Sequence, residues 1–179
     1  MARDHIVITD AGTRDLPGED STWPEWVSAS KGRNFVRGQL LLDWLDTHGK
    51  RKGFVPDEKD PDYDERFDFL EALFKLGDAF EAAVMRWLSE RFEIVRVGSG
   101  WEDTQDRTVA ELTFEAMSKG REIIEQAVLW NPETRTYGAP DLLVRSDVLN
   151  QIVPDTLSAE EAAVPAPGLE GESWHYVVV

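Results

Sequence analysis

Two carboxylates of the sequence are the residues best placed to do chemistry, Asp141 and Glu81. Asp141 opens the apolar run Leu142 to Val144, directly after the turn-forming residues Gly138 and Pro140. An ionised carboxylate beside a buried strand is unfavourable unless a metal ion, a helix N-terminus or a basic group pairs with it. Because carboxylate oxygens suit the hard cations Mg²⁺ and Mn²⁺, Asp141 is a candidate metal ligand. The alternative is an Asx turn after the proline.

Glu81 lies in the longest helical pattern of the chain, which begins near Asp64. It follows Phe80 on the apolar face and lies about one helical turn from Gly77 and Val84. A glutamate at the edge of an apolar face can point into a cleft, whereas helix geometry alone favours a solvated position on the flank. The two interpretations of Glu81 both stay open.

The elements that must position these carboxylates alternate between helices and strands, which predicts an α/β fold: a mixed sheet flanked by helices, with an N-terminal helical portion. The helices are expected over Lys31 to Thr47, from Asp64 onward, and over Gln105 to Ser118. The last of these would be capped by Asp103 or Thr104 and would stop at Gly120. The strands are expected near residues 93–97, 121–130, 136–145 and 174–179. Residues 131–135 would form a hairpin turn, and the return strand would carry Asp141.

The domain organisation predicted from the sequence is an irregular segment over residues 1–27 followed by one domain over residues 28–179. Residues 149–173 form a long acidic loop in this prediction, with a short helix near residues 159–163. The chain then ends on the strand-like run Trp174 to Val179. Such a run is typical of a strand in the interior of a sheet, so we expect the fold to be incomplete at the C-terminus. An unpaired strand edge there would invite a partner chain that completes the sheet.

Composition excludes several classes of site. There is no cysteine, which excludes disulfides, thiolate zinc sites and a cysteine nucleophile, and the three histidines lie far apart. No run of about 18 apolar residues indicates a membrane helix, and the charged N-terminus leads into no signal core, so a cytoplasmic protein with no membrane contact is expected. The net charge of −16 argues against tight non-specific binding of nucleic acid.

Several aromatic and polar residues have a second possible role. Gln126 could face the site, although a plain strand residue is the simpler interpretation, and His175 is expected at a strand end rather than as a base. Five tryptophans could stack on bases, but an aromatic core is the expected position for them. They are Trp23, Trp26, Trp44, Trp87 and Trp130.

Four segments, taken in order, resemble the motifs of the RecB-like branch of the PD-(D/E)XK nuclease superfamily. They are Ser28-Ala29-Ser30, Leu76-Gly77-Asp78-Ala79-Phe80-Glu81, Gly138-Ala139-Pro140-Asp141-Leu142-Leu143-Val144 and His175-Tyr176-Val177-Val178-Val179. The resemblance covers roughly residues 28–179 and implies a restriction-endonuclease-like fold. It also implies a nuclease acting on DNA, with Glu81 and Asp141 as catalytic ligands of Mg²⁺ or Mn²⁺.

The sequence departs from that family in two respects. Family members add an Asp or Glu, one residue and then a Lys after the last strand motif, a position that would fall just past Val179. We therefore expect the chain as written to be truncated before that motif and inactive. The cysteines of the iron–sulfur relatives are also absent. The alternative function is a non-catalytic acidic interaction protein, or a DNA mimic, on the same scaffold.

Overall fold

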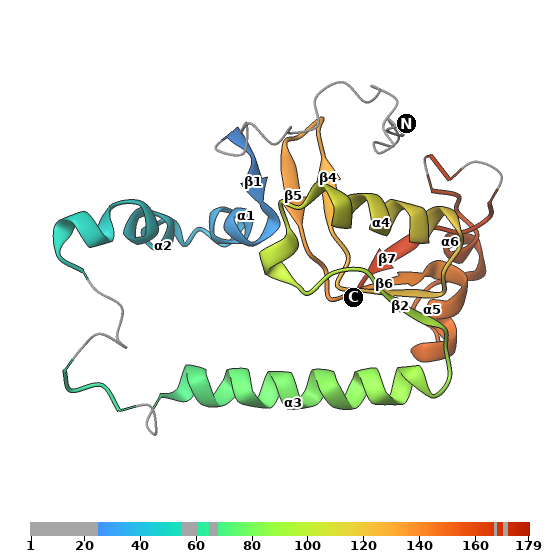
Figure 1. The fold of residues 1–179 in the computed structure, drawn as a ribbon, viewed down its shortest axis with the longest axis horizontal. Coiled ribbons are helices and arrows are strands. Elements are labelled where there is room, and N and C mark those ends of the chain that lie inside the picture. Colours follow the sequence, from blue (N-terminus) through green and yellow to red (C-terminus); the bar gives the residue numbers. More distant parts are fainter. Residues whose placement is uncertain (1–24, 55–60, 65–67, 167, 170–171) are drawn as a thin grey trace. The chain divides into compact units, whose positions relative to one another are not determined.

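The computed structural model describes residues 25–54, 61–64, 68–166, 168–169 and 172–179, and within these ranges the chain is mixed α/β (Figure 1). It divides into two compact units, one of residues 30–91 and one built from residues 1–29 and 92–179. Most of the irregular segment expected over residues 1–27 lies outside the described residues.

The helical part of residues 30–54 differs from the single helix expected over residues 31–47. Helix α1 (Ala29–Val36) stops before Gly38, whose φ of +69° favours glycine and interrupts the helix. Helix α2 (Leu40–Trp44) then continues through a π turn, η2 (Leu45–Gly49), and a 3₁₀ turn, η3 (Lys50–Lys52). The helical stretch thus ends at Gly53, with φ +89°, rather than near Gly49.

Helix α3 (Phe69–Ser89) confirms the long helix predicted from the apolar pattern and continues through Gly77. The carboxylate of Asp68 caps it, accepting hydrogen bonds from the main-chain N–H groups of Leu70 and Glu71. These bonds, that from Glu71 foremost, and one from the Tyr63 hydroxyl hold the pKa of Asp68 below its usual range.

The strands form two mixed sheets instead of the one that was expected. A four-stranded sheet has the order β2 (Ile94–Arg96), β3 (Ile123–Glu125), β6 (Leu142–Arg145), β7 (Tyr176–Val178). Its β2–β3 pair is parallel and its other pairs are antiparallel. A three-stranded sheet has the order β1 (Val27–Ser28), β5 (Thr136–Gly138), β4 (Leu129–Asn131), with β1 parallel to β5.

Two strand predictions are therefore wrong in the same way. The run 121–130 divides into β3 and β4, because Gln126 adopts a φ of +53° that no extended strand permits. The run 136–145 divides into β5 and β6 on either side of Ala139–Asp141, where Pro140 has no N–H for a ladder. Asp141 consequently precedes β6 and is not carried by the return strand of the hairpin. The hairpin turn itself is confirmed between β4 and β5.

Helix α4 (Arg107–Ser118) packs on the sheets at β3 and β4 through small side chains. Its buried residues are Val109, Ala110, Thr113 and Ala116, whereas Leu112 is 43% exposed. Ala116 joins Ile124, Ala127 and Leu143 in one core cluster. Its cap is Asp106 rather than Asp103 or Thr104, and its predicted stop at Gly120 is confirmed by a φ of +68°.

The segment after β6 contains more structure than a loop. Helix α5 (Ser146–Ile152) begins directly at the end of the strand. Helix α6 (Ala159–Ala162) confirms the short helix expected near residues 159–163, and a capping box between Ser158 and Glu161 fixes its start. Those capping hydrogen bonds lower the pKa of Glu161.

The tryptophans are only partly a core feature. Trp26 is buried, and its ring meets that of Trp130 edge-on, with ring centroids 6.5 Å apart. Trp44 and Trp87 are each 41% exposed, so the expectation of a core position is wrong for them, and Trp23 lies outside the described residues. Across the described ranges, no helix has both the length and the apolar character needed to cross a bilayer.

The hydroxyl of Thr113 joins α4 to the segment between the two sheets. It donates to the Val109 carbonyl and accepts from the Val128 N–H, both at 2.9 Å, in a fully buried position. Thr113→Val keeps the shape and leaves that N–H unpaired, so we expect a loss of about 1–3 kcal/mol of unfolding free energy. Urea denaturation measures it. Thr108→Val, the same change at an exposed position of α4, is the matched control; equal losses in the two variants would contradict the assignment.

Candidate functional site

Asp141 lies at the end of the four-stranded sheet where all four strands present a terminus or a turn. The parallel strands β2 and β3 end here, β6 begins here and β7 runs toward it. Val179 and Leu142 exchange main-chain hydrogen bonds of 3.0 and 3.3 Å, so the last residue of the chain lies beside the neighbour of Asp141. This end of the sheet therefore gathers main-chain segments that are distant in the sequence (Figure 1).

The main chain of Asp141 is fixed, whereas its side chain is not. The Asp141 carbonyl accepts the N–H of Gln126 at 2.9 Å, which extends the β3–β6 ladder by one pair. The carboxylate is exposed, and among the described residues no ion pair or side-chain hydrogen bond engages it. The Asx-turn alternative thus has no hydrogen bond here to support it. A carboxylate on a rigid main chain with free oxygens can accept a cation.

A second carboxylate, Glu125, lies at the same end of the sheet and was missed by the sequence reasoning. It stands opposite Leu142, and its side chain is 16% exposed. Arg96 neutralises it with a 3.1 Å ion pair and also donates to the Gly98 carbonyl at 3.0 Å. Successive residues of a strand face opposite sides of a sheet, so Glu125 shares a face with Leu142 rather than with the position of Asp141. The only sequence signal was one acidic residue inside an apolar strand.

The loop after β2 closes tightly against Gln126. A Cβ atom placed on Gly98 would lie 2.7 Å from the Gln126 carbonyl oxygen, closer than real Cβ atoms approach. The next turn is held by Asp103, whose carboxylate accepts from the main-chain N–H of Ser99 at 2.6 Å and from its hydroxyl at 2.8 Å. These bonds, the one from the main chain first, lower the pKa of Asp103. The loop therefore supports the conformation of Gln126 next to Asp141.

Glu81 belongs to the other unit. It is an exposed residue of α3, and among the described residues its carboxylate has no ion pair or side-chain hydrogen bond. Because each unit is described by itself, the convergence of Glu81 with Asp141 stays a prediction. Over the described ranges, no three His, Asp or Glu side chains are grouped as a metal site would require.

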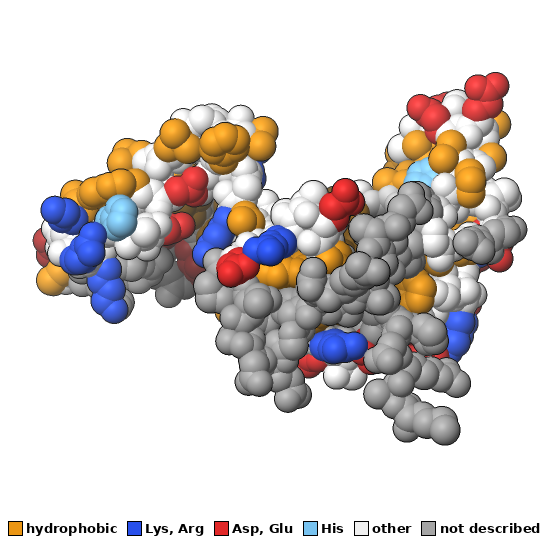
Figure 2. Space-filling view, turned by 90° about the horizontal axis from the view of Figure 1, so that it is seen from above, with side chains coloured by type: hydrophobic (Ala, Val, Ile, Leu, Met, Phe, Trp, Pro, Cys, Tyr) orange, Lys and Arg blue, Asp and Glu red, His pale blue; other side chains and the backbone are white. Residues whose placement is uncertain are grey.

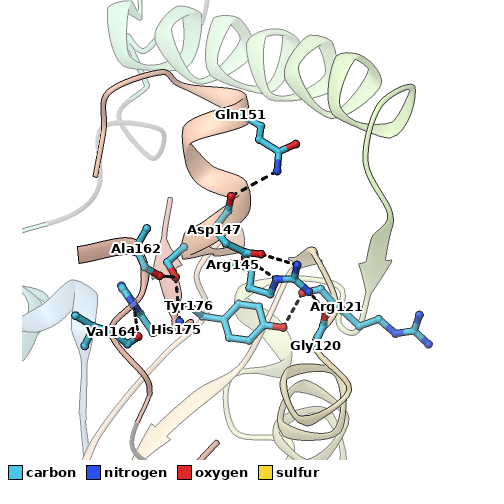
Figure 3. Close-up of polar contacts among 10 residues, drawn as sticks. Gly120, Arg121, Arg145, Asp147, Gln151, Ala162, Val164, His175 and Tyr176 are labelled. Carbon is cyan, nitrogen blue, oxygen red and sulfur yellow. Dashed lines mark hydrogen bonds and ion pairs between the residues drawn. The ribbon is translucent and has the colours of Figure 1, made fainter. Parts of the chain in front are cut away.

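The opposite end of β6 carries a dense polar cluster around Arg145 (Figure 3). Its guanidinium donates to both oxygens of Asp147, at 2.6 and 2.7 Å, and to the Gly120 carbonyl at 2.7 Å. It also lies over the Trp174 ring, 5.4 Å from the centroid. The bond to Asp147 raises the pKa of Arg145. An arginine engaged on three sides fixes β6 to its neighbours and has little capacity left for a ligand.

The remaining polar groups of this cluster are also satisfied internally. The buried Ser146 hydroxyl donates to the Ala162 carbonyl at 2.7 Å and accepts the His175 N–H at 3.0 Å. The Tyr176 hydroxyl donates to the Arg121 carbonyl at 2.6 Å, and burial raises the pKa of Tyr176 well above its usual range. His175 Nδ1 lies 3.0 Å from the Val164 carbonyl. These contacts give His175 a structural role in the described region.

The close approach at Gly98 gives a direct test of the Asp141 end. Gly98→Ala adds a Cβ atom that would clash with the Gln126 carbonyl oxygen. We expect this clash to lower the free energy of unfolding by about 1–3 kcal/mol. Gly77→Ala is the control, because its Cβ meets open space in a helix interior and should stabilise α3 by up to about 1 kcal/mol. Chemical denaturation measures both. A neutral Gly98→Ala variant would show that the loop does not pack as described.

Comparison with known proteins identifies no relative: no protein-family model, no curated protein and no solved structure matches the chain.

Proposed function

We propose that the chain is the scaffold of a divalent-metal-dependent nuclease, with Asp141 as a metal-binding carboxylate and DNA phosphodiesters as the substrate class. The observation that carries the proposal is the position of Asp141: an exposed carboxylate, unpaired within the described region, on a fixed main chain at the end of a buried sheet. The order of the four motif-like segments supports the same function. With it goes the proposal of a restriction-endonuclease-like fold.

The donors that the chain offers fit a hard cation. Asp141 and Glu81 are exposed carboxylates without a described partner, whereas Glu125 is already neutralised by Arg96. Mg²⁺ or Mn²⁺, when bound, would supply a more acidic water and stabilise negative charge on a phosphate. Asp141 would hold it, and the resemblance adds Glu81 as the second candidate ligand.

The protein's own contribution is to fix the first ligand. The Gln126 N–H holds the Asp141 main chain, and Gly98 packs against the Gln126 carbonyl from the other side. A ligand held on a strand end keeps its position better than one on a free loop, and a metal site depends on such precision. The β3–β6 pair is therefore the support of the proposed centre.

Metal binding can be measured without any substrate. We expect Mn²⁺ titration followed by electron paramagnetic resonance to show binding that Asp141→Asn weakens at least about tenfold, because a charged ligand is lost. Glu81→Gln should weaken it as well if both residues share the site. Asp155→Asn is the matched control, an exposed aspartate of the same unit. Equal affinity in the Asp141→Asn and Asp155→Asn variants would refute the proposed ligand.

Cleavage is a separate expectation. It is measured by incubating linear DNA with the protein and Mg²⁺ or Mn²⁺ beside an Asp141→Ala control. Cleavage at the level of that control is the result expected of a scaffold that binds metal without cutting, and clear cleavage above it would show that the groups needed for cleavage are present.

One observation favours the alternative of a non-catalytic acidic interaction protein. Residues 92–179 carry 16 acidic and 6 basic residues, or −10, and all six basic side chains are already paired with carboxylates. Such a surface suits a basic partner, including one that normally binds DNA. The metal titration separates the two functions, because an acidic interaction surface needs no bound Mn²⁺.

A further inference from the structure

The cations of the chain are divided into two populations. Every Lys and Arg of residues 92–179 pairs with a carboxylate: Arg96 with Glu125, Arg107 with Glu111, Lys119 with Glu115, Arg121 with Glu93, Arg135 with Glu25 and Arg145 with Asp147. A groove of about 180 Å³ between β2 and α4 is lined in part by Arg96, Lys119 and Arg121, which all belong to this paired set. No surplus positive charge is left on this part of the molecule.

Residues 30–54, in contrast, carry an excess of positive charge. They carry six Lys or Arg and two Asp, or +4, in a chain of −16, which leaves −20 for the rest. Four of these cations are exposed and have no ion pair among the described residues: Arg33, Arg37, Lys50 and Lys52. Exposed like charges repel one another, so a group of unpaired cations on an acidic protein is favourable mainly when an anionic partner binds there.

Local hydrogen bonds and ring contacts hold together the segment that carries these cations. The Asn34 side chain donates to the Asp43 carboxylate at 2.8 Å and joins α1 to α2. Phe54 folds back, donating its N–H to the Gly49 carbonyl at 3.1 Å and placing its ring edge-on to Trp44, with centroids 6.4 Å apart. Figure 2 shows Lys and Arg side chains gathered beside a histidine, next to hydrophobic ones, over this helical segment.

Aromatic rings are interleaved with the cations. Phe35 lies between Arg33 and Arg37 in the sequence and is 73% exposed, and Phe54 follows the three cations of η3 at 58% exposed. Trp44 is also exposed. Exposed rings among cations are the combination that binds single-stranded nucleic acid, because bases stack on the rings while the cations neutralise phosphates. Paired bases of a duplex have no face free for such stacking.

We propose that residues 30–54, the cationic aromatic segment, bind single-stranded DNA. The inference rests on the proposed function, and it names the strand form of the substrate and the surface that recognises it. Charge complementarity selects this segment, since it is the part of the described chain with unpaired cations in excess. An anionic lipid surface carries the same negative charge as DNA and would also meet the exposed leucines of α2. Anionic lipid vesicles are therefore the competing ligand in the test.

The experiment uses the full chain, a fluorescein-labelled 20-nucleotide oligo(dT) and EDTA, with fluorescence anisotropy as the readout. We expect binding at about 50 mM salt that falls steeply by 200 mM. Lys50→Ala/Arg51→Ala/Lys52→Ala should weaken it at least about tenfold and reduce the slope of log K against log salt by about 2, since each contact to a single strand contributes about 0.7. Arg107→Ala/Lys119→Ala, which removes paired cations, should leave the affinity unchanged.

One further variant and the presence of EDTA make the outcome specific. Phe35→Ala, a change at a highly exposed ring, should weaken oligo(dT) binding at least about fivefold and leave duplex binding unchanged. Because the titration is run in EDTA, its result does not depend on Mn²⁺ binding, so loss of metal binding and loss of DNA binding are distinguishable results.

Three results would overturn the proposal. They are no binding of oligo(dT) at 50 mM salt, equal weakening by the Arg107→Ala/Lys119→Ala control, and binding to phosphatidylserine vesicles with none to oligo(dT). Circular dichroism of each variant establishes that the helices are retained.

Discussion

The antiparallel pairing of β3 with β6 is the constraint on which the rest of the larger unit depends. Ile123, Ile124, Leu143 and Val144 are almost completely buried, so the pair is covered on both faces. β2 and β7 add to its two sides, α4 packs on one face, and the ladder continues into the Gln126–Asp141 hydrogen bond. Burial of four large aliphatic side chains thus fixes the main chain of the proposed metal ligand, although its carboxylate touches none of them.

Charge is distributed as unevenly as burial. Over residues 92–179 each Lys and Arg pairs with a carboxylate, which joins strands and helix turns and leaves this surface acidic. Each surface ion pair of this kind contributes little to stability. The pairing of every cation therefore matters more for the net charge that the surface presents to a partner. The helical segment of residues 30–54 keeps its cations exposed. One chain therefore presents two surfaces that suit partners of opposite charge.

Most of the strands were predicted from the sequence, but their division between two sheets was not. Apolar runs located the strands around Ile94, Ile124, Val144 and Val177, because β-branched residues mark buried strands regardless of their partners. The division into two sheets was missed, since it depends on a non-glycine residue, Gln126, in a left-handed conformation beside Gly98. Residue periodicity carries no information on such a conformation.

The candidate site was predictable in part. Asp141 was found because it is a lone acid that follows turn-forming residues and directly precedes a buried apolar run. The Arg96–Glu125 pair was not found, because it joins positions 29 residues apart through strand register. The buried face of α4 does not follow side-chain size either: Ala116 is buried and Leu112 is not, since a close helix–sheet contact selects small side chains.

The described strand pairs all join residues 27–28 or residues 94–178 to one another, and none involves residues 30–91. The parallel pairing of Val27 with Thr136 places β1 in the larger unit, directly before the helical residues begin. The helical unit is thus an insertion in topological terms, entering and leaving one scaffold between β1 and β2. A change in the length of this insertion would alter no strand register of the described sheets.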